Sequence, residues 1–242
     1  MKFLLYIKYF VYISFNWNLK IATHILLQEI RGEKKYGINT TGSDELKKLE
    51  EKGIDISHAT IYMPVSYSLL EEIFGQLNFL NNKQQTTNNK QQKSNPSTLK
   101  PLNHFLDLGC GKGRALCVAA HKGFGKVTGI DISKELCERA KQNCIVTQKK
   151  IHEFEFSIIN NDAFYYEIPA DVDCIFMFNP FDEMIMSGVV ENIRNSLAKD
   201  PRSILILYIN PLHKELFINA GFKEIFYSKK MKYLELSILS NS

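Results

Sequence analysis

The chain has 242 residues, of which 45% are hydrophobic and 23% are charged, so it can bury one substantial core and is too short for two full-sized domains with a linker. Its net charge of +4 is small for this length and its lysines are scattered, which argues against a nucleic-acid substrate. The five cysteines show no CxxC pairing and no nearby histidine, so they predict reduced thiols in a cytoplasmic protein, with no metal site and no disulfide framework.

Residues 1–17 form an apolar segment that is rich in Phe, Tyr, Leu and Ile and has no acidic residue. Lys8 interrupts this segment, so it lacks the uninterrupted ~20 apolar residues that a membrane-spanning helix needs, and no small-residue cleavage site follows. We expect a helix that packs on the domain. A signal peptide and a membrane-surface anchor are the alternatives.

Further helices are expected in front of the main domain. Residues 17–31 have apolar side chains at helical spacing and should end at Gly32, where a helix would stop. Residues 43–52 should form a short capped helix, and residues 67–80 an amphipathic one. Together with the first segment they make residues 1–80 an N-terminal helical extension.

Residues 81–98 consist almost entirely of Asn, Gln, Lys, Thr and Ser. Such a segment cannot bury enough apolar surface to offset the entropy of ordering it, so we expect a disordered linker. A binding segment is the less common alternative. The remaining residues, 99–242, should form the catalytic domain.

Strands and helices alternate from residue 104 onward. The expected strands are residues 104–108, 126–131, 153–159, 172–178 and 203–209, and the expected helices are residues 114–122, 134–148, 183–199 and 212–220. This alternation predicts a mostly parallel sheet that is covered on both faces. The chain ends with strands at 222–228 and 232–239, joined by a short turn at 229–231, so this last pair must be antiparallel.

A glycine-rich turn follows the first strand, with glycines at positions 109, 111 and 113. Glycine lets the backbone approach a ligand closely, and the helix that follows presents free N–H groups. Such a turn lies at the switch point of an open α/β sheet, where ligands bind. Asp131 ends the second strand, and its carboxylate can accept hydrogen bonds from both hydroxyls of an adenosine ribose.

An NAD(P)-dependent oxidoreductase is the main competing interpretation, because dinucleotide-binding folds have a similar turn. Three features argue against it. The glycine spacing is GxGxG where the dinucleotide fingerprint is GxGxxG, Asp107 lies two residues before the first glycine, and the antiparallel C-terminal pair is foreign to the dehydrogenase sheet.

The Asp-x-Gly-x-Gly-x-Gly turn, the acidic end of the second strand and the C-terminal strand pair resemble those of the class I S-adenosylmethionine-dependent methyltransferases, over residues 102–239. The resemblance implies an α/β fold with a seven-stranded, mostly parallel sheet of order 3-2-1-4-5-7-6, an antiparallel C-terminal hairpin and helices on both faces. It also implies S-adenosylmethionine as the cofactor.

The resemblance assigns cofactor contacts to particular residues. Asp107, Gly109, Gly111 and Gly113 would hold the methionine end, Asp131 the ribose, and Asp162 and Ala163 the adenine, with further contacts from Cys110 and Ile132. Asp162 is equally suited to cap a helix, which does not exclude the other role. Cys110 has no partner to activate it, so we interpret it as a small residue that fits the turn.

Asn179, Pro180 and Phe181 follow the fourth strand and resemble the Asn-Pro-Pro-Tyr/Phe motif of amino-group methyltransferases, with one proline missing. The resemblance implies that Asn179 accepts N–H bonds from the target nitrogen and that Phe181 stacks on the substrate. The missing proline argues against a nucleotide base as the acceptor. The alternative is a turn that merely ends the strand.

A Tyr-x-Pro-x-x-Tyr stretch runs from Tyr62 to Tyr67 and is similar to one in small methyltransferases related to the Dot1-like and mitochondrial lysine methyltransferases. It implies that both tyrosines line the cofactor pocket, although packing of an N-terminal helix on the sheet explains them equally well. We therefore expect a methyltransferase that acts on an amino nitrogen of a protein lysine or a small molecule. A non-catalytic cofactor-binding scaffold is a further alternative.

Overall fold

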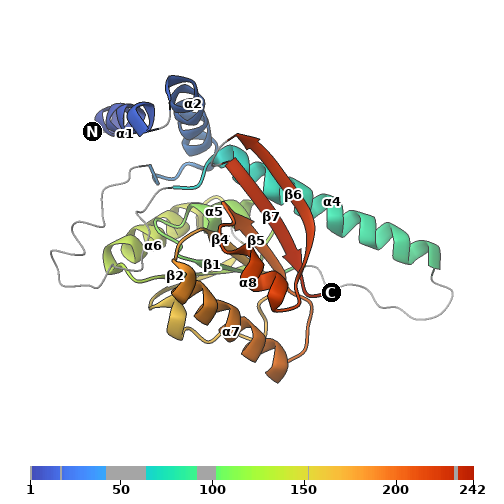
Figure 1. Ribbon diagram of the computed structural model, residues 1–242. Coiled ribbons are helices and arrows are strands. Elements are labelled where there is room, and N and C mark those ends of the chain that lie inside the picture. Colours follow the sequence, from blue (N-terminus) through green and yellow to red (C-terminus); the bar gives the residue numbers. More distant parts are fainter. Residues whose placement is uncertain (1, 17, 42–63, 92–101, 152, 232–233) are drawn as a thin grey trace.

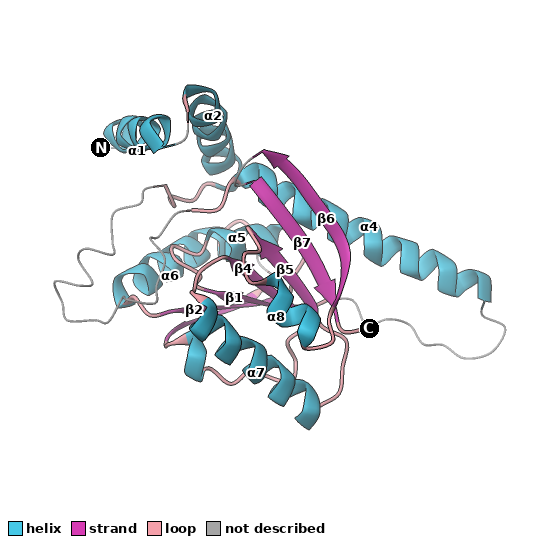
Figure 2. Cartoon of the chain, in the orientation of Figure 1, coloured by secondary structure: helices cyan, strands magenta, loops and turns pink. Residues whose placement is uncertain are grey.

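The computed structural model describes residues 2–16, 18–41, 64–91, 102–151, 153–231 and 234–242. These residues form a central sheet with helices on both faces, and two N-terminal helices lie beside it (Figures 1 and 2). None of the helices in these ranges combines the length and the apolar character that crossing a membrane requires.

The sheet has seven strands in the order β3-β2-β1-β4-β5-β7-β6, as predicted. The first five strands along the chain pair in parallel, and β7 pairs antiparallel with both β5 and β6. The strands are β1 (His104–Leu108), β2 (Lys126–Asp131), β3 (Glu155–Asn160), β4 (Cys174–Phe178), β5 (Leu205–Ile209), β6 (Lys223–Met231) and β7 (Leu234–Ser240). The order reverses direction at β1, so the carboxyl end of β1 lies at the switch point of the sheet.

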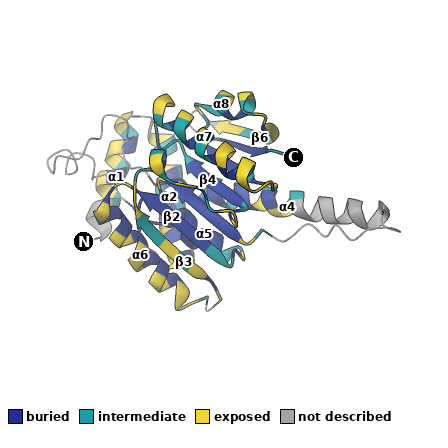
Figure 3. Cartoon of the chain, turned by 90° about the horizontal axis from the view of Figure 1, so that it is seen from below, coloured by how far each residue is buried: buried dark blue, intermediate teal, exposed yellow. Residues whose placement is uncertain are grey.

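Two hydrophobic clusters hold the layers together, one on each face of the sheet. The central strands between the helices are largely buried (Figure 3). The first cluster lies under α4 (Tyr67–Gln91), α5 (Arg114–His121) and α6 (Lys134–Gln148). The second lies under α7 (Glu183–Lys199), α8 (Lys214–Asn219) and the short 3-10 helix η1 (Ala163–Tyr165). Every residue of β1 is buried, as expected for a central strand that is covered on both sides.

Helices α1 (Lys2–Asn16) and α2 (Leu19–Tyr36) pack against each other through a small core of Tyr9, Ile13, Ala22 and Ile25. The expected stop of α2 at Gly32 is wrong, because the helix continues to Tyr36 and ends at Gly37, whose φ is 69°. A Cβ at position 32 would overlap the ring of Tyr67 on α4. The glycine therefore serves the close approach of two helices.

Two further boundaries differ from the prediction by three residues or more. Helix α4 continues to Gln91, so the expected linker is wrong over residues 81–91. Extending an existing helix avoids a new nucleation step, so residues of modest helix propensity can continue it. Strand β6 continues to Met231 and pairs with β7, so the turn predicted at 229–231 is wrong. The expected helix at 43–52 and the rest of the linker lie outside the described residues.

Candidate active site

The glycine turn lies at the carboxyl end of β1, with φ of 78° at Gly109, 53° at Gly111 and 76° at Gly113. The backbone N–H groups of Gly109 and Cys110 both donate to the carbonyl oxygen of Ile130, each at 2.9 Å. A Cβ on Gly109 would lie only 2.6 Å from Cβ of Pro180. The turn after β1 and the turn after β4 are therefore in direct contact, and this contact requires glycine at position 109.

Asp131 connects the end of β2 to the glycine turn. Its Oδ2 accepts a hydrogen bond from the backbone N–H of Gly111 at 2.8 Å, and its Oδ1 accepts one from Ser133 at 2.9 Å. A carboxylate offers about four acceptor positions, so these two backbone bonds are compatible with further bonds from ribose hydroxyls. The residue expected to hold the ribose thus also fixes the shape of the turn.

Two buried acids make this end of the sheet suited to a cation. Asp107 is buried, and its burial and then the nearby charge of Asp131 raise the pKa of its carboxyl well above the usual value. Protonation of Asp107 relieves the repulsion between the two acids, and a bound cation would relieve it as well. The residues therefore fit the methionine end of S-adenosylmethionine, which carries a sulfonium and an ammonium group.

Cys110 is not an activated nucleophile. Burial, followed by the charges of Asp131 and Asp107, raises the pKa of its thiol well above the usual value, so the reactive thiolate is disfavoured. All five cysteines are free and buried. These observations agree with the interpretation of Cys110 as a small residue that fits the turn.

The expected adenine side is built around η1. Asp162 caps this helix, because its side chain accepts a hydrogen bond from the backbone N–H of Phe164 at 2.9 Å. Ala163 is buried, whereas Ile132, in the loop after β2, is 37% exposed. The capping role of Asp162 is confirmed, whereas contacts of Asp162 and Ala163 with adenine, and of Ile132 with the cofactor, stay predictions.

The turn after β4 places Asn179 in the left-handed region, with a φ of 37°. Such φ values are uncommon for residues other than glycine and often occur at functional sites. Oδ1 of Asn179 accepts a hydrogen bond of 3.4 Å from the hydroxyl of Tyr208 on β5. Burial raises the pKa of Tyr208 to about 12, although a bond from the backbone of His213 lowers it, so the hydroxyl keeps its proton and can donate.

Tyr62 lies outside the described residues, and Tyr67 is enclosed by protein. The ring of Tyr67 is stacked with Tyr36 at 5.7 Å between centroids, and Cζ of Arg114 lies 4.2 Å from its centroid. The Tyr67 hydroxyl is 3.3 Å from Oγ1 of Thr40. These contacts favour the second interpretation of Tyr67, in which it packs the N-terminal segment on the domain.

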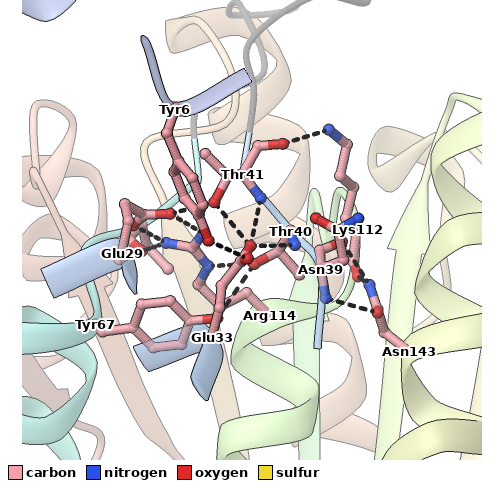
Figure 4. A network of polar contacts seen from close by, with 11 residues as sticks. Tyr6, Glu29, Glu33, Asn39, Thr40, Thr41, Tyr67, Lys112, Arg114 and Asn143 are labelled. Atoms are coloured by element: carbon pink, nitrogen blue, oxygen red, sulfur yellow. Dashed lines mark hydrogen bonds and ion pairs between the residues drawn. The ribbon is translucent and has the colours of Figure 1, made fainter. Parts of the chain in front are cut away.

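A buried ion pair that the sequence reasoning missed joins the extension to the glycine turn (Figure 4). Arg114, the residue after Gly113, donates from Nη1 and Nη2 to the two carboxylate oxygens of Glu29 at 2.6 and 2.5 Å. Its Nε donates to Thr40 at 2.7 Å. Glu29 is 0% exposed and Arg114 is 3% exposed, so this charge pair is removed from water.

Glu33, one helical turn after Glu29, completes the network (Figure 4). Its Oε1 accepts from the backbone N–H of Thr40 and Thr41 at 2.9 and 3.0 Å, and its Oε2 accepts from the hydroxyl of Tyr6 at 2.6 Å. Burial raises the pKa of Glu33, but these hydrogen bonds and one from the Thr41 hydroxyl lower it below the usual value overall. Lys112 reaches the same segment, because its Nζ donates to the carbonyl of Thr41 at 3.3 Å.

A family model described as a methyltransferase domain matches residues 99–237. No curated protein matches the chain. Among solved structures, the chain is similar to a SAM-dependent methyltransferase from Aquifex aeolicus, with 18% identity, a TM-score of 0.45, and coverage of 60% of this chain and 85% of that one.

The chain is also similar to a protein from Pyrococcus horikoshii, with 19% identity, a TM-score of 0.44, and coverage of 59% of this chain and 83% of that one. A third similar structure is magnesium protoporphyrin IX methyltransferase from Synechocystis with bound SAM, with 15% identity, a TM-score of 0.44, and coverage of 58% of this chain and 70% of that one. The family match alone covers more than half of the chain. The chain therefore belongs to the methyltransferase domain family, with the sheet order of class I and S-adenosylmethionine as its cofactor.

Proposed function

We propose that this methyltransferase transfers its methyl group to an amino nitrogen, on a protein lysine or a small molecule. The observation that carries the proposal is the contact between the Asn179-Pro180-Phe181 turn and the glycine turn. The position of a Cβ on Gly109 is 2.6 Å from Pro180 and 3.9 Å from Cζ of Phe181. An acceptor held by Asn179 and Phe181 would then lie beside the cofactor turn.

The residues at the end of β1 and β2 would hold the cofactor. Asp107 and the glycine turn would take the methionine end, Asp131 the ribose, and Asp162 with Ala163 the adenine. When bound, the cofactor supplies a methyl group that its sulfonium already activates. The protein then has to bring the acceptor into line with that methyl group and to exclude water, which positioning achieves.

Asn179 is oriented for this task by Tyr208. The hydroxyl of Tyr208 donates to Oδ1 of Asn179 at 3.4 Å, which favours the amide orientation with its oxygen as an acceptor at this position. An amine N–H bond that is donated to the same oxygen would have its position set, and the lone pair on that nitrogen could be aimed at the methyl group. The amine must be neutral, because a protonated amine has no lone pair to attack with.

The test uses labelled S-adenosylmethionine and a cell extract fractionated into protein, nucleic acid and small molecules. The proposal expects label in the protein or small-molecule fraction, in a form stable to mild base, because N-methyl groups resist base and methyl esters do not. Label confined to nucleic acid, or label that base releases, would contradict an amino acceptor. Cofactor binding with no label in any fraction would support a non-catalytic scaffold.

Two variants separate binding from transfer. Asn179→Ala should lower the transfer rate by about 10²-fold, the cost of a misplaced reactant, while binding of S-adenosylhomocysteine by calorimetry stays unchanged. Asn195→Ala, at an exposed position of α7, is the matched control. Asp131→Ala should weaken binding of S-adenosylhomocysteine by about 1–3 kcal/mol, the scale of lost hydrogen bonds to a charged group. Equal rates for the two Asn variants would contradict the role of Asn179.

A further inference from the structure

The hairpin of α1 and α2 carries an outward apolar surface that the catalytic site does not use. Seven large apolar side chains are exposed between residues 7 and 30: Ile7, Val11, Tyr12, Phe15, Leu19, Leu27 and Ile30. Phe15 is 88% exposed, the largest exposed fraction among the large apolar side chains of the described residues. Single exposed apolar residues are ordinary on a protein surface, but a group of this size on one hairpin marks an interaction surface.

The spacing of these residues shows that they form a surface of their own. Ile7, Val11 and Phe15 recur at every fourth residue, so they lie along one side of α1. The hairpin already has an internal core of Tyr9, Ile13, Ala22 and Ile25. The exposed side chains are therefore additional to the contacts that hold α1 and α2 together.

The charge on the same hairpin is one-sided. Lys8, Lys20, Arg31, Lys34 and Lys35 are all exposed, and of these Lys35 forms an ion pair with Glu71 on α4 at 2.5 Å. The two acids of these helices, Glu29 and Glu33, are buried in the network with Arg114, Thr41 and Tyr6. Among the described side chains of α1 and α2, the surface thus presents positive charge and apolar groups with no exposed carboxylate, and this combination complements an anionic lipid bilayer.

We propose that the outer surface of the α1–α2 hairpin docks on an anionic lipid bilayer surface. Helix α1 has 15 residues and is about 22 Å long at 1.5 Å per residue, against ~30 Å for the hydrocarbon core, so it lies along the interface. Phe15 and the apolar stripe enter the boundary between headgroups and acyl chains, and the lysines face the headgroup phosphates. This proposal rests on the hairpin surface and is independent of the acceptor.

Docking would also hold the active site close to the bilayer. Glu29 on α2 is bonded to Arg114, the residue that follows the glycine turn, so the hairpin and the cofactor turn are connected by a buried ion pair. Because of this connection, binding of S-adenosylhomocysteine serves as an independent check on folding. A surface variant of the hairpin that still folds correctly should bind S-adenosylhomocysteine as the wild type does.

Flotation of the full chain with lipid vesicles tests the proposal. The protein should float with vesicles made of equal parts phosphatidylcholine and phosphatidylglycerol, and much less with phosphatidylcholine alone. Phe15→Gln should lower the partition coefficient about tenfold, because it removes a large apolar side chain from the interface. The double variant Lys8→Gln with Lys20→Gln should lower the partition coefficient about fivefold for each charge removed. Added salt should reduce the difference between this variant and the wild type.

Matched controls lie elsewhere on the surface. Phe79→Gln on α4, where the phenylalanine is 61% exposed, and Lys141→Gln on α6, which is exposed, should bind vesicles as the wild type does. Failure of the wild type to bind anionic vesicles, or equal loss in the Phe15 and Phe79 variants, would overturn the proposal. A concentration-dependent dimer in analytical ultracentrifugation that Phe15→Gln abolishes, without vesicle binding, would show that a second copy of the chain occupies this surface instead.

Discussion

Replacing Glu29 by Gln tests how strongly the N-terminal extension supports the cofactor turn. The substitution keeps the size of the side chain and removes the negative charge that faces the guanidinium of Arg114. The two Arg114–Glu29 hydrogen bonds measure 2.6 and 2.5 Å, and both residues are almost completely buried. Removing one partner of such a pair costs roughly 3–5 kcal/mol, because a charge stays buried without its counter-charge.

The free energy of unfolding from chemical denaturation measures this cost directly. For a chain of this size the loss corresponds to a fall in melting temperature of roughly 10 °C. The matched control is Glu191→Gln, because Glu191 forms an ion pair with Arg194 at 3.1 Å and both side chains are more than half exposed. This exposed pair should contribute at most about 1 kcal/mol.

A double variant, Glu29→Leu with Arg114→Met, separates the ion pair from its surroundings. It removes both charges, so it should recover part of the stability that Glu29→Gln loses. Equal stability of the Glu29→Gln and Glu191→Gln variants would refute the reasoning.

Two predictions concern the cofactor turn itself. Gly109→Ala should destabilise the protein by more than the ~1–2 kcal/mol that a positive φ costs an alanine, because the added Cβ would also meet Pro180. The control is Gly123→Ala, where φ is 97° and no atom lies within 4 Å of the added Cβ, so it measures the backbone cost alone. Asp107→Asn should stabilise the protein at neutral pH, because folding raises the pKa of Asp107; the gain is ~1.4 kcal/mol for each pH unit between its unfolded pKa and the lower of the solution pH and its folded pKa. Wild-type stability falls as the pH rises from the unfolded pKa of Asp107 to its raised folded pKa. The stability gained by Asp107→Asn should therefore vanish in acid, and chemical denaturation of both proteins at neutral and at acidic pH measures this. A gain that persists in acid would contradict this cause.

The sheet could be predicted from the sequence because its determinants are local. Apolar runs separated by amphipathic helices define five parallel strands, and the absence of a helix between β6 and β7 defines the antiparallel pair. One of the boundaries that were wrong depends on a contact distant in sequence. Gly32 looks like a helix stop, and only the ring of Tyr67 on α4 explains why it lies inside α2.

The candidate site also has a part that the sequence predicts and a part that it does not. The glycine turn and Asp131 are a motif with fixed spacing, and the structure brings them together through the bond from Gly111 to Asp131. Glu29 and Arg114 are 85 residues apart, and no motif joins them. A signal was present nevertheless: Glu29 and Glu33, the two acids of α2, lie one helical turn apart, a spacing that places both carboxylates on one face.

The position of Arg114 also explains why the extension and the cofactor turn depend on each other. Arg114 is the first residue of α5, where the helix dipole disfavours a positive charge. It is also buried, which disfavours the charge further. The carboxylate of Glu29 offsets both costs, so the extension contributes electrostatic compensation as well as packing. A domain that began at residue 99 would keep the glycine turn and Asp131 but would leave Arg114 without Glu29 at the start of α5. Helix α2 therefore stabilises, through Glu29, the start of the helix that follows the glycine turn.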